Sequence, residues 1–357
     1  MDGFLWLADG SRHRGTLVGA CGLASGELVF NTSMTGYQEI LTDPSYHRQI
    51  VVLTHPEIGN YGCHPQVSES ELGHAAGMVF RHLSPGSWHR TRQQDFGGML
   101  AAKGITAITA LDTRWLTRRI REKGPQNALI APAAMDEATA SEALAKIPPM
   151  AGANLVPEVS VSSPERHGEG ETHIVLMDFG IKTATIRALA ARNCTVTLVP
   201  WNFDIEKIAA LSPDGVLLSN GPGDPAALTE VCGTVAAAME RWPVMGICLG
   251  FQIMAIALGG KTYKLPFGHR GGNHPVRWNG RVVITSQNHG FAVVSDSLDP
   301  ALVELTHHSL FDGSLEGFHL RKRPVFGVQF HPEAAPGPHD CLDHFDHFLS
   351  LVRGRHA

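Results

Sequence analysis

Residues 244–258 read VMGICLGFQIMAIAL, an apolar run that ends at a thiol and continues as a helix-like stretch. Val244–Ile247 has the composition of a buried strand, and residues 252–258 have that of a helix. Small residues flank Cys248, so we expect the strand to turn directly into the helix as a nucleophile elbow, which presents one side chain on a tight, strained bend. The unpaired N–H groups at a helix N-terminus favour thiolate over thiol. We therefore expect Cys248 to attack a carbonyl carbon.

The second half of the chain alternates strand and helix patterns. Strands are expected at residues 173–178, 195–199, 215–219 and 244–247, and helices at residues 182–192 and 229–241. This alternation predicts an α/β fold, with a doubly wound, mostly parallel sheet in the C-terminal domain. Ligands of such sheets bind at the carboxyl ends of strands, where the loop 220–225 and the turn at Cys248 fall. We expect the loop and the turn to lie side by side.

The first half mixes short strand-like runs with turns rich in Gly and Pro, which predicts a strand-rich α/β domain. One helix is well marked, because Asp112 can cap its start and Gly124 ends it. Four arginines occupy its outer face: Arg114, Arg118, Arg119 and Arg121. A solvated face is one interpretation of these arginines, and contact with a protein partner is the other.

A chain of 357 residues exceeds the usual size of a single core, so two domains are expected. Residues 148–172 are rich in Pro, Ser, Gly and Glu, a composition typical of an interdomain linker. The predicted organisation is therefore a domain at 1–147, a linker at 148–172 and a second domain at 173–357.

The composition excludes some classes of partner. A formal net charge of -5 with 18% charged residues gives no basic footprint for nucleic acid or for a membrane surface. The N-terminus carries early acidic residues and too short an apolar run for a signal peptide or a membrane span. The six cysteines are scattered without a C-x-x-C pair, which suits a reducing compartment. A cytoplasmic location is therefore expected.

A nucleophilic thiol needs a base and a group that orients the base, and the tripeptide His331-Pro332-Glu333 offers both just after the strand-like run 325–330. Residues two apart in an extended segment point the same way, so the imidazole and the carboxylate are expected to be neighbours. Taken alone, the tripeptide also fits a strand-end histidine beside a solvated glutamate.

The loop 219–225 reads SNGPGDP, and its glycines would let backbone N–H groups approach a reacting carbonyl. An ordinary Gly-Pro turn is the alternative. No metal site is expected in this chain. Three histidines near acidic residues are interpreted as part of a packing helix, because phenylalanines accompany them and no tetrahedral ligand set emerges: His339, His344 and His347.

Together and in this order, the elbow, the loop and the tripeptide resemble the class I (triad) glutamine amidotransferases. The first half narrows the resemblance to the small-subunit family of carbamoyl-phosphate synthetases, through NTSMTGYQE at 31–39 and TDPSY at 42–46. The segments GHRGGNHP at 268–275 and QNHGF at 287–291 are similar to the same family. The resemblance covers nearly the whole chain.

The resemblance implies that Cys248 is the nucleophile, His331 the general base and acid, and Glu333 the group that orients it. Backbone N–H groups of Gly221 and Leu249 would hold the oxyanion. The implied glutamine-binding residues, with Ser45 reaching in from the first domain, are Ser45, Gly221, Gly223, Leu249, Gln252, Asn288, Gly290 and Phe291. One departure is Phe251, where the family more commonly has histidine, and it affects the packing around the thiol rather than the triad.

The implied activity is hydrolysis of L-glutamine through a γ-glutamyl thioester. The ammonia would pass to a large synthetase subunit that makes carbamoyl phosphate from bicarbonate and ATP. This chain would need no cofactor of its own, because ATP and Mg²⁺ are expected on the partner. Two alternatives stay open: a free-standing thiol hydrolase of γ-glutamyl amides with the same fold, and a non-catalytic regulatory protein, against which the intact Cys248, His331 and Glu333 argue.

Overall fold

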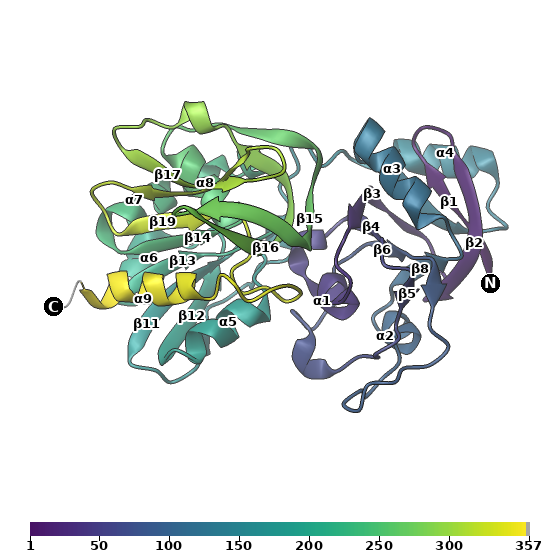
Figure 1. Cartoon of the computed structure of the whole chain (residues 1–357), viewed down its shortest axis with the longest axis horizontal. Helices are drawn as coiled ribbons and strands as arrows, with labels where there is room; N and C mark the ends of the chain where they lie inside the picture. Colours follow the sequence, from purple (N-terminus) through teal and green to yellow (C-terminus); the bar gives the residue numbers. More distant parts are fainter. Residues whose placement is uncertain (355–357) are drawn as a thin grey trace. The chain divides into compact units, whose positions relative to one another are not determined.

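The computed structural model describes residues 1–354, and the chain divides into two compact units, Met1–Met150 and Ala151–Ala357 (Figure 1). Each unit has its own core of buried apolar side chains. Two domains were expected from the length of the chain. No helix in the described part of the chain is both long and apolar enough to cross a membrane.

The N-terminal unit is built on a closed barrel with the strand order β1-β2-β8-β6-β4-β3-β9. These strands are β1 Asp2–Leu7, β2 Arg12–Gly19, β3 Ala24–Asn31, β4 Gln49–Leu53, β6 Gly77–Val79, β8 Thr106–Thr109 and β9 Gln126–Pro132. A separate short pair joins β5 Glu57–Ile58 to β7 His82–Leu83. The helices of this unit are α1 Tyr37–Thr42, α2 Phe96–Ala102, α3 Thr113–Lys123 and α4 Glu137–Ala145. The prediction of a strand-rich α/β unit is confirmed.

Helix α3 begins and ends where the sequence predicts. The Asp112 side chain accepts a hydrogen bond of 2.9 Å from the backbone N–H of Trp115, which satisfies one of the unpaired donors of the first turn. Gly124 follows the last residue with a φ of 85°, in the left-handed region that glycine adopts without strain. Leu116 and Ile120 bury the inner face of the helix.

A mixed sheet forms the C-terminal unit, in the order β10-β12-β11-β13-β14-β19-β18-β17-β15-β16. The strands are β10 Glu165–His167, β11 Thr172–Asp178, β12 Cys194–Pro200, β13 Gly215–Leu218, β14 Val244–Ile247, β15 Thr262–Trp278, β16 Arg281–Val293, β17 Val303–Ser309, β18 Leu315–Leu320 and β19 Val325–Val328. Neighbouring strands are parallel from β12 to β19. The remaining pairs are antiparallel.

The expectation of a mostly parallel sheet therefore applies to the part from β12 to β19 and not to the whole sheet. The antiparallel part is built from hairpins, of which the largest joins β15 to β16 (Figure 1). Antiparallel strands can follow one another through short turns, whereas parallel neighbours need a crossover, here supplied by helices. The strand-helix alternation of the sequence detects only the parallel part.

Helices cover both faces of the parallel strands. They are α5 Thr183–Ala190, α6 Ile205–Ala210, α7 Cys232–Arg241, α8 Leu249–Ala257 and α9 Asp343–Gly354. Side chains alternate along β11, so that Val175 and Met177 pack with α6, α7 and α8, while Ile174 and Leu176 pack with α5 and α9. Two cores on opposite faces hold the strand ends in place, and the candidate site lies at these ends.

Most of the segment predicted as a linker, 148–172, folds onto the C-terminal unit. Strand β10 pairs antiparallel with β12 at the edge of the sheet. Val156 is fully buried in the core with α7 and α8. Asp178 accepts a hydrogen bond of 2.7 Å from the backbone N–H of Val161. The Pro- and Ser-rich composition concealed this, because a few buried apolar residues suffice to anchor such a segment.

Candidate active site

Cys248 lies directly between strand β14 and helix α8, as the elbow prediction requires. Its φ of 53° and ψ of -102° lie outside the regions that a residue with a side chain normally adopts. The backbone N–H of Cys248 donates to Val328 of β19 at 2.9 Å, which ties the turn to the neighbouring strand. The surrounding sheet and helix thus hold the thiol in a strained conformation, as is common at functional sites.

Two glycines make this tight turn sterically possible. A Cβ on Gly250 would lie 2.3 Å from the carbonyl oxygen of Leu218, and one on Gly246 would lie 2.4 Å from the sulfur of Met254. The first clash involves backbone, which cannot move aside without displacing β13. The small residues that flank Cys248 in the sequence are therefore required by packing.

Gly250→Ala is expected to lower the stability of the C-terminal unit by about 1–3 kcal/mol, because the added methyl group overlaps the backbone of β13. The measurement is the midpoint of thermal unfolding. Gly233→Ala in α7 is the matched control, since its Cβ would meet nothing within 4 Å. That change should be neutral or stabilising by up to about 1 kcal/mol. Equal behaviour of the two variants would contradict the steric argument.

His331 and Glu333 are neighbours, as predicted from their spacing. His331 Nδ1 lies 2.7 Å from Glu333 Oε1, and both side chains are buried. The backbone N–H of His331 donates to the carbonyl of Ser286 at 2.9 Å, which fixes the segment against β16. The alternative of a solvated glutamate beside a strand-end histidine is excluded by this burial.

Lys182 completes this group of charges and was not identified from the sequence. Its ammonium lies 3.1 Å from Glu333 Oε1, donates to the carbonyl of Ala334, and the residue is only 2% exposed. Lysine is almost never fully buried without a partner of opposite charge. The sequence places Lys182 only at the start of a predicted helix, and nothing in its local pattern indicates burial or a contact with a residue so distant along the chain.

The charges in this group shift each other's protonation. Burial alone would lower the pKa of His331, but the charge of Glu333 and the hydrogen bond with Cys248 outweigh it, and the pKa of the ring is raised. Burial would raise the pKa of Glu333, but the charges of Lys182 and His331 prevail and lower it. The carboxylate thus stays ionised and the imidazole holds its proton at neutral pH.

Cys248 lies close enough to His331 to influence the protonation of the ring. Within residues 1–354, however, His331 Nε2 makes no hydrogen bond of good geometry. Catalytic hydrogen bonds of free enzymes are often long or poorly aligned and tighten when substrate binds. The arrangement therefore fits a nucleophile and base awaiting substrate.

Several predicted glutamine-binding residues surround the thiol. The Cys248 thiol lies 3.7 Å from the carbonyl oxygen of Asn288. The Gln252 side-chain amide donates to the carbonyl of Phe291 at 2.7 Å and to Gln329 Oε1 at 2.9 Å. Gln329 in turn donates to the sulfur of Cys248 at 3.6 Å. Gln329, just after β19, is a second residue that the sequence did not single out, and it links the thiol to Gln252.

The loop after β13 lies against the elbow, as predicted. The backbone N–H of Gly250 donates to the carbonyl of Ser219 at 3.0 Å. A Cβ on Gly221 would lie 2.9 Å from the side chain of Leu249 and 2.0 Å from the carbonyl oxygen of Phe179. Gly221 and Leu249, the two residues predicted to supply oxyanion donors, are therefore neighbours, and only glycine fits at position 221.

Gly223 has a φ of 94°, which favours glycine, and the next residue fastens the loop. The Asp224 backbone donates to the carbonyl of Ala153 at 2.9 Å, and its carboxylate accepts from Gly152 at 2.8 Å. Gly290 lies in β16 between Asn288 and Phe291. Ser45 is a buried residue of the N-terminal unit, and its part in glutamine binding stays a prediction.

Phe251 is fully buried in α8 and packs against Phe318 of β18, with ring centroids 5.0 Å apart. It also lies close to Gly327 of β19. The residue that departs from the family pattern is therefore part of the core between α8 and the sheet. His344, one of the three C-terminal histidines, likewise packs in the interior, with its ring 4.4 Å from that of Trp278.

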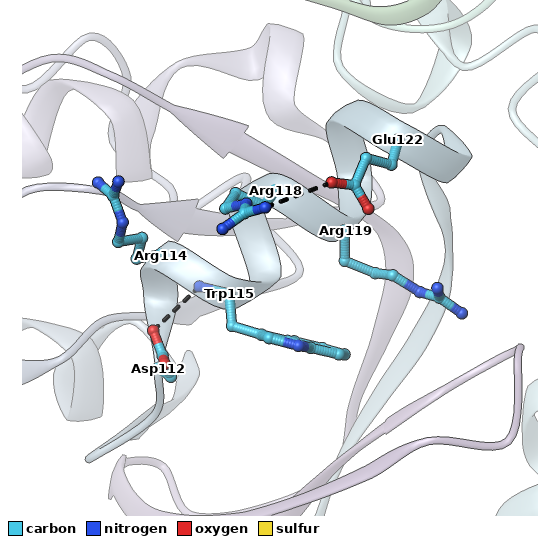
Figure 2. Close-up of a pocket in the computed structure, with 6 residues that line it drawn as sticks. All are labelled: Asp112, Arg114, Trp115, Arg118, Arg119 and Glu122. Carbon is cyan, nitrogen blue, oxygen red and sulfur yellow. Dashed lines mark hydrogen bonds and ion pairs between the residues drawn. The ribbon is translucent and has the colours of Figure 1, made fainter.

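The arginine-bearing face of α3 borders a hollow of about 310 Å³ in the N-terminal unit (Figure 2). Arg119 forms an ion pair of 2.6 Å with Asp9, and Arg118 lies 3.9 Å from Glu122 one turn away. Arg114 extends away from both, at the start of the helix (Figure 2). At least two of the four arginines thus have partners within the unit, and contact of this face with another protein stays a prediction.

Comparison with known proteins matches both halves of the chain. The family model described as "Glutamine amidotransferase class-I" matches residues 175–351, and "Carbamoyl-phosphate synthase small chain, CPSase domain" matches residues 5–130. The chain is 46% identical to the carbamoyl phosphate synthase small chain of Salmonella typhimurium, covering 98% of this chain and 96% of that protein. Identity to the small chain of Vibrio vulnificus is also 46%, covering 99% and 98%.

Among solved structures, the chain is similar to a GMP synthase protein from Thermoplasma acidophilum, with 22% identity and a TM-score of 0.47. That match covers 53% of this chain and 98% of the other.

Proposed function

Because the chain belongs to the carbamoyl-phosphate synthase small-chain family, we propose that it hydrolyses L-glutamine and supplies ammonia to a large synthetase subunit. The large subunit would combine the ammonia with bicarbonate and ATP to form carbamoyl phosphate. The observation that carries the proposal is the buried set of Cys248, His331 and Glu333 at the end of the parallel strands. This set is what an amide-cleaving thiol site needs.

Each step of the reaction has a group in place. The sulfur of Cys248 attacks the carboxamide carbon of glutamine, and the carbonyl oxygen becomes an oxyanion. Backbone N–H groups of Gly221 and Leu249 would stabilise it, which their close approach supports. The C–N bond then breaks, and His331 donates a proton to the leaving ammonia. The raised pKa of this ring supports that role, because it keeps the proton available.

The product of the first half is a γ-glutamyl thioester on Cys248. Water, deprotonated by His331, attacks the thioester carbon, and the C–S bond breaks to release glutamate and regenerate the thiol. Glu333 holds the imidazole in orientation throughout, at 2.7 Å from Nδ1. Lys182 neutralises the buried carboxylate. No cofactor is needed for these steps, and ATP with Mg²⁺ would act on the partner subunit.

We further propose that Gln252, Asn288, Gly290 and Phe291 line the glutamine pocket with Gly223 and Ser45. The contacts of Asn288, Gln252 and Phe291 with the thiol or with each other support this. Helices on both faces of the parallel strands support a doubly wound class I amidotransferase fold. Six free cysteines without a disulfide support a cytoplasmic location.

The proposal is tested by measuring glutamate release from glutamine by the purified chain alone and with a large carbamoyl-phosphate synthase subunit. We expect stimulation of at least about tenfold by the partner, because a subunit that releases ammonia without a consumer gains nothing from full activity alone. Carbamoyl phosphate should form from glutamine only when both subunits are present. Full turnover by the isolated chain, unchanged by the partner, would favour a free-standing hydrolase of γ-glutamyl amides.

A further inference from the structure

Three buried side chains converge one residue beyond Asn288: His269 on β15, His289 on β16 and Glu316 on β18. One nitrogen from each ring and one carboxylate oxygen all lie within 4.8 Å of one another. The register of β15 and β16 pairs His269 directly with His289, so both rings lie on the same face of the hairpin. Glu316 Oε1 lies 3.5 Å from His269 Nδ1 and 3.9 Å from His289 Nε2.

The hydrogen bonds on the outer side of these groups fix which atoms face inward. His289 Nδ1 lies 2.8 Å from the carbonyl oxygen of Phe291, which can only accept, so this nitrogen carries the proton and Nε2 has the lone pair. His269 Nε2 lies 3.0 Å from Asp312, so that nitrogen donates to the carboxylate. Glu316 accepts from the Gln287 amide through Oε2, at 2.8 Å.

The inward atoms of this cluster are left without hydrogen-bond partners among the residues the structure describes: His269 Nδ1, His289 Nε2 and Glu316 Oε1. A second proton on His269 would face Glu316, but it would leave the lone pair of His289 unsatisfied in the interior. A buried polar atom without a partner costs about 1–3 kcal/mol. A single cation at the centre would satisfy all three atoms.

We propose that His269, His289 and Glu316 bind a zinc ion. Zinc prefers nitrogen and carboxylate ligands at about 2.0–2.2 Å, which places tetrahedral ligand atoms about 3.4 Å apart. The separations of the two ring nitrogens from Glu316 Oε1 are close to this value, and the two histidine nitrogens would approach each other slightly on binding. Mg²⁺ and Ca²⁺ favour oxygen ligands and fit this set poorly. A water molecule would take the fourth position.

The outer hydrogen bonds match the usual surroundings of a zinc ligand, in which the second ring nitrogen donates to a carboxylate or a backbone carbonyl. Asp312 and the carbonyl of Phe291 fill these roles here. The ion would join the β15–β16 hairpin to β18 and so steady the segment that carries Asn288 and Phe291. The role inferred is structural, and it is independent of the proposed glutaminase reaction.

The test uses the full chain after chelator treatment and dialysis. With Zn²⁺ added, we expect about one tightly held zinc per chain by inductively coupled plasma mass spectrometry, and a rise of at least about 5 °C in the thermal midpoint. Mg²⁺ at the same concentration should produce no such rise. Neither readout requires enzymatic activity.

Glu316→Gln should lower zinc affinity at least about 100-fold while keeping the shape of the side chain. Asp312→Asn, which loses only the outer contact of His269, should lower it about 10–100-fold. Glu304→Gln is the control, because Glu304 also lies near a histidine, His319 at 3.4 Å, but at the surface. That variant should bind zinc as the wild type does.

The proposal is overturned if the wild type retains no zinc and its thermal midpoint is unchanged by Zn²⁺. It is also overturned if Glu316→Gln and Asp312→Asn bind zinc as tightly as Glu304→Gln. Should Glu316→Gln fail to fold, Asp312→Asn decides between the outcomes, since the Asp312 side chain is partly exposed.

Discussion

Replacing Cys248 with alanine is expected to lower the rate of glutamine hydrolysis at least about 10³-fold. The variant lacks the atom that forms the thioester, and neither His331 nor the backbone donors can replace a nucleophile. The change removes a single sulfur atom and keeps the Cβ, so the thermal midpoint should change by only a few degrees. The measurements are steady-state release of glutamate and a search for the γ-glutamyl adduct by mass spectrometry.

A control separates loss of chemistry from loss of structure. Together with the large subunit, Cys248→Ala should still support carbamoyl phosphate synthesis when ammonium salt replaces glutamine, because external ammonia bypasses the glutaminase site. Cys341→Ala, which removes another buried thiol, should keep glutaminase activity. Substantial glutamine hydrolysis by Cys248→Ala would show that another group is the nucleophile and would end the proposed mechanism.

Lys182→Met is expected to lower the thermal midpoint of the C-terminal unit by about 10 °C, which corresponds to about 3–5 kcal/mol. The ammonium lies 3.1 Å from Glu333 and is buried, so its removal leaves a carboxylate in the interior with His331 to balance it. Glutamine hydrolysis should fall as well, because the protonation of His331 and Glu333 is set jointly. Calorimetry and the glutaminase assay measure the two effects.

The double variant Lys182→Met/Glu333→Gln should recover most of the lost stability, since it removes both buried charges, but not the lost activity. Arg241→Met is the matched control, because the Arg241–Glu206 ion pair of 2.7 Å is exposed. Exposed pairs contribute at most about 1 kcal/mol. A loss of stability no larger in Lys182→Met than in Arg241→Met would contradict the assigned burial and pairing of Lys182.

The same ion pair predicts a dependence on pH. The pKa of Glu333 is lowered in the folded protein, from an ordinary value of 4.5. Its stabilising contribution is therefore fully present above that ordinary value and is lost as the pH falls through the lower, folded pKa. The difference in thermal midpoint between wild type and Lys182→Met should be constant near neutral pH and should shrink under acidic conditions.

The sequence identified the catalytic elements well because each depends on local geometry. A run of four apolar residues before Cys248 and small residues beside it can form only a short strand and a sharp turn, and the structure has both. The spacing of His331 and Glu333 likewise implied neighbouring side chains, which lie 2.7 Å apart. The cap at Asp112 and the end at Gly124 defined α3 for the same reason.

Contacts between distant segments could not be predicted in this way. Lys182 meets Glu333, and Gln329 bridges Cys248 and Gln252, only because the sheet brings their strands together. The segment 148–172 has the composition of a linker, yet Val156 inserts into the core. The antiparallel extension from β18 to β16 was also missed, since hairpins leave no strand-helix alternation.

The amino-acid sequence by itself determined the turn at Cys248, the pairing of His331 with Glu333 and the strand-helix order of the parallel strands, because backbone sterics and side-chain periodicity act over a few residues. The tertiary structure alone decided which charges are buried together. Lys182 beside Glu333, and the convergence of His269, His289 and Glu316, depend on strand order and on exclusion of water, and both arise only when the whole sheet has formed.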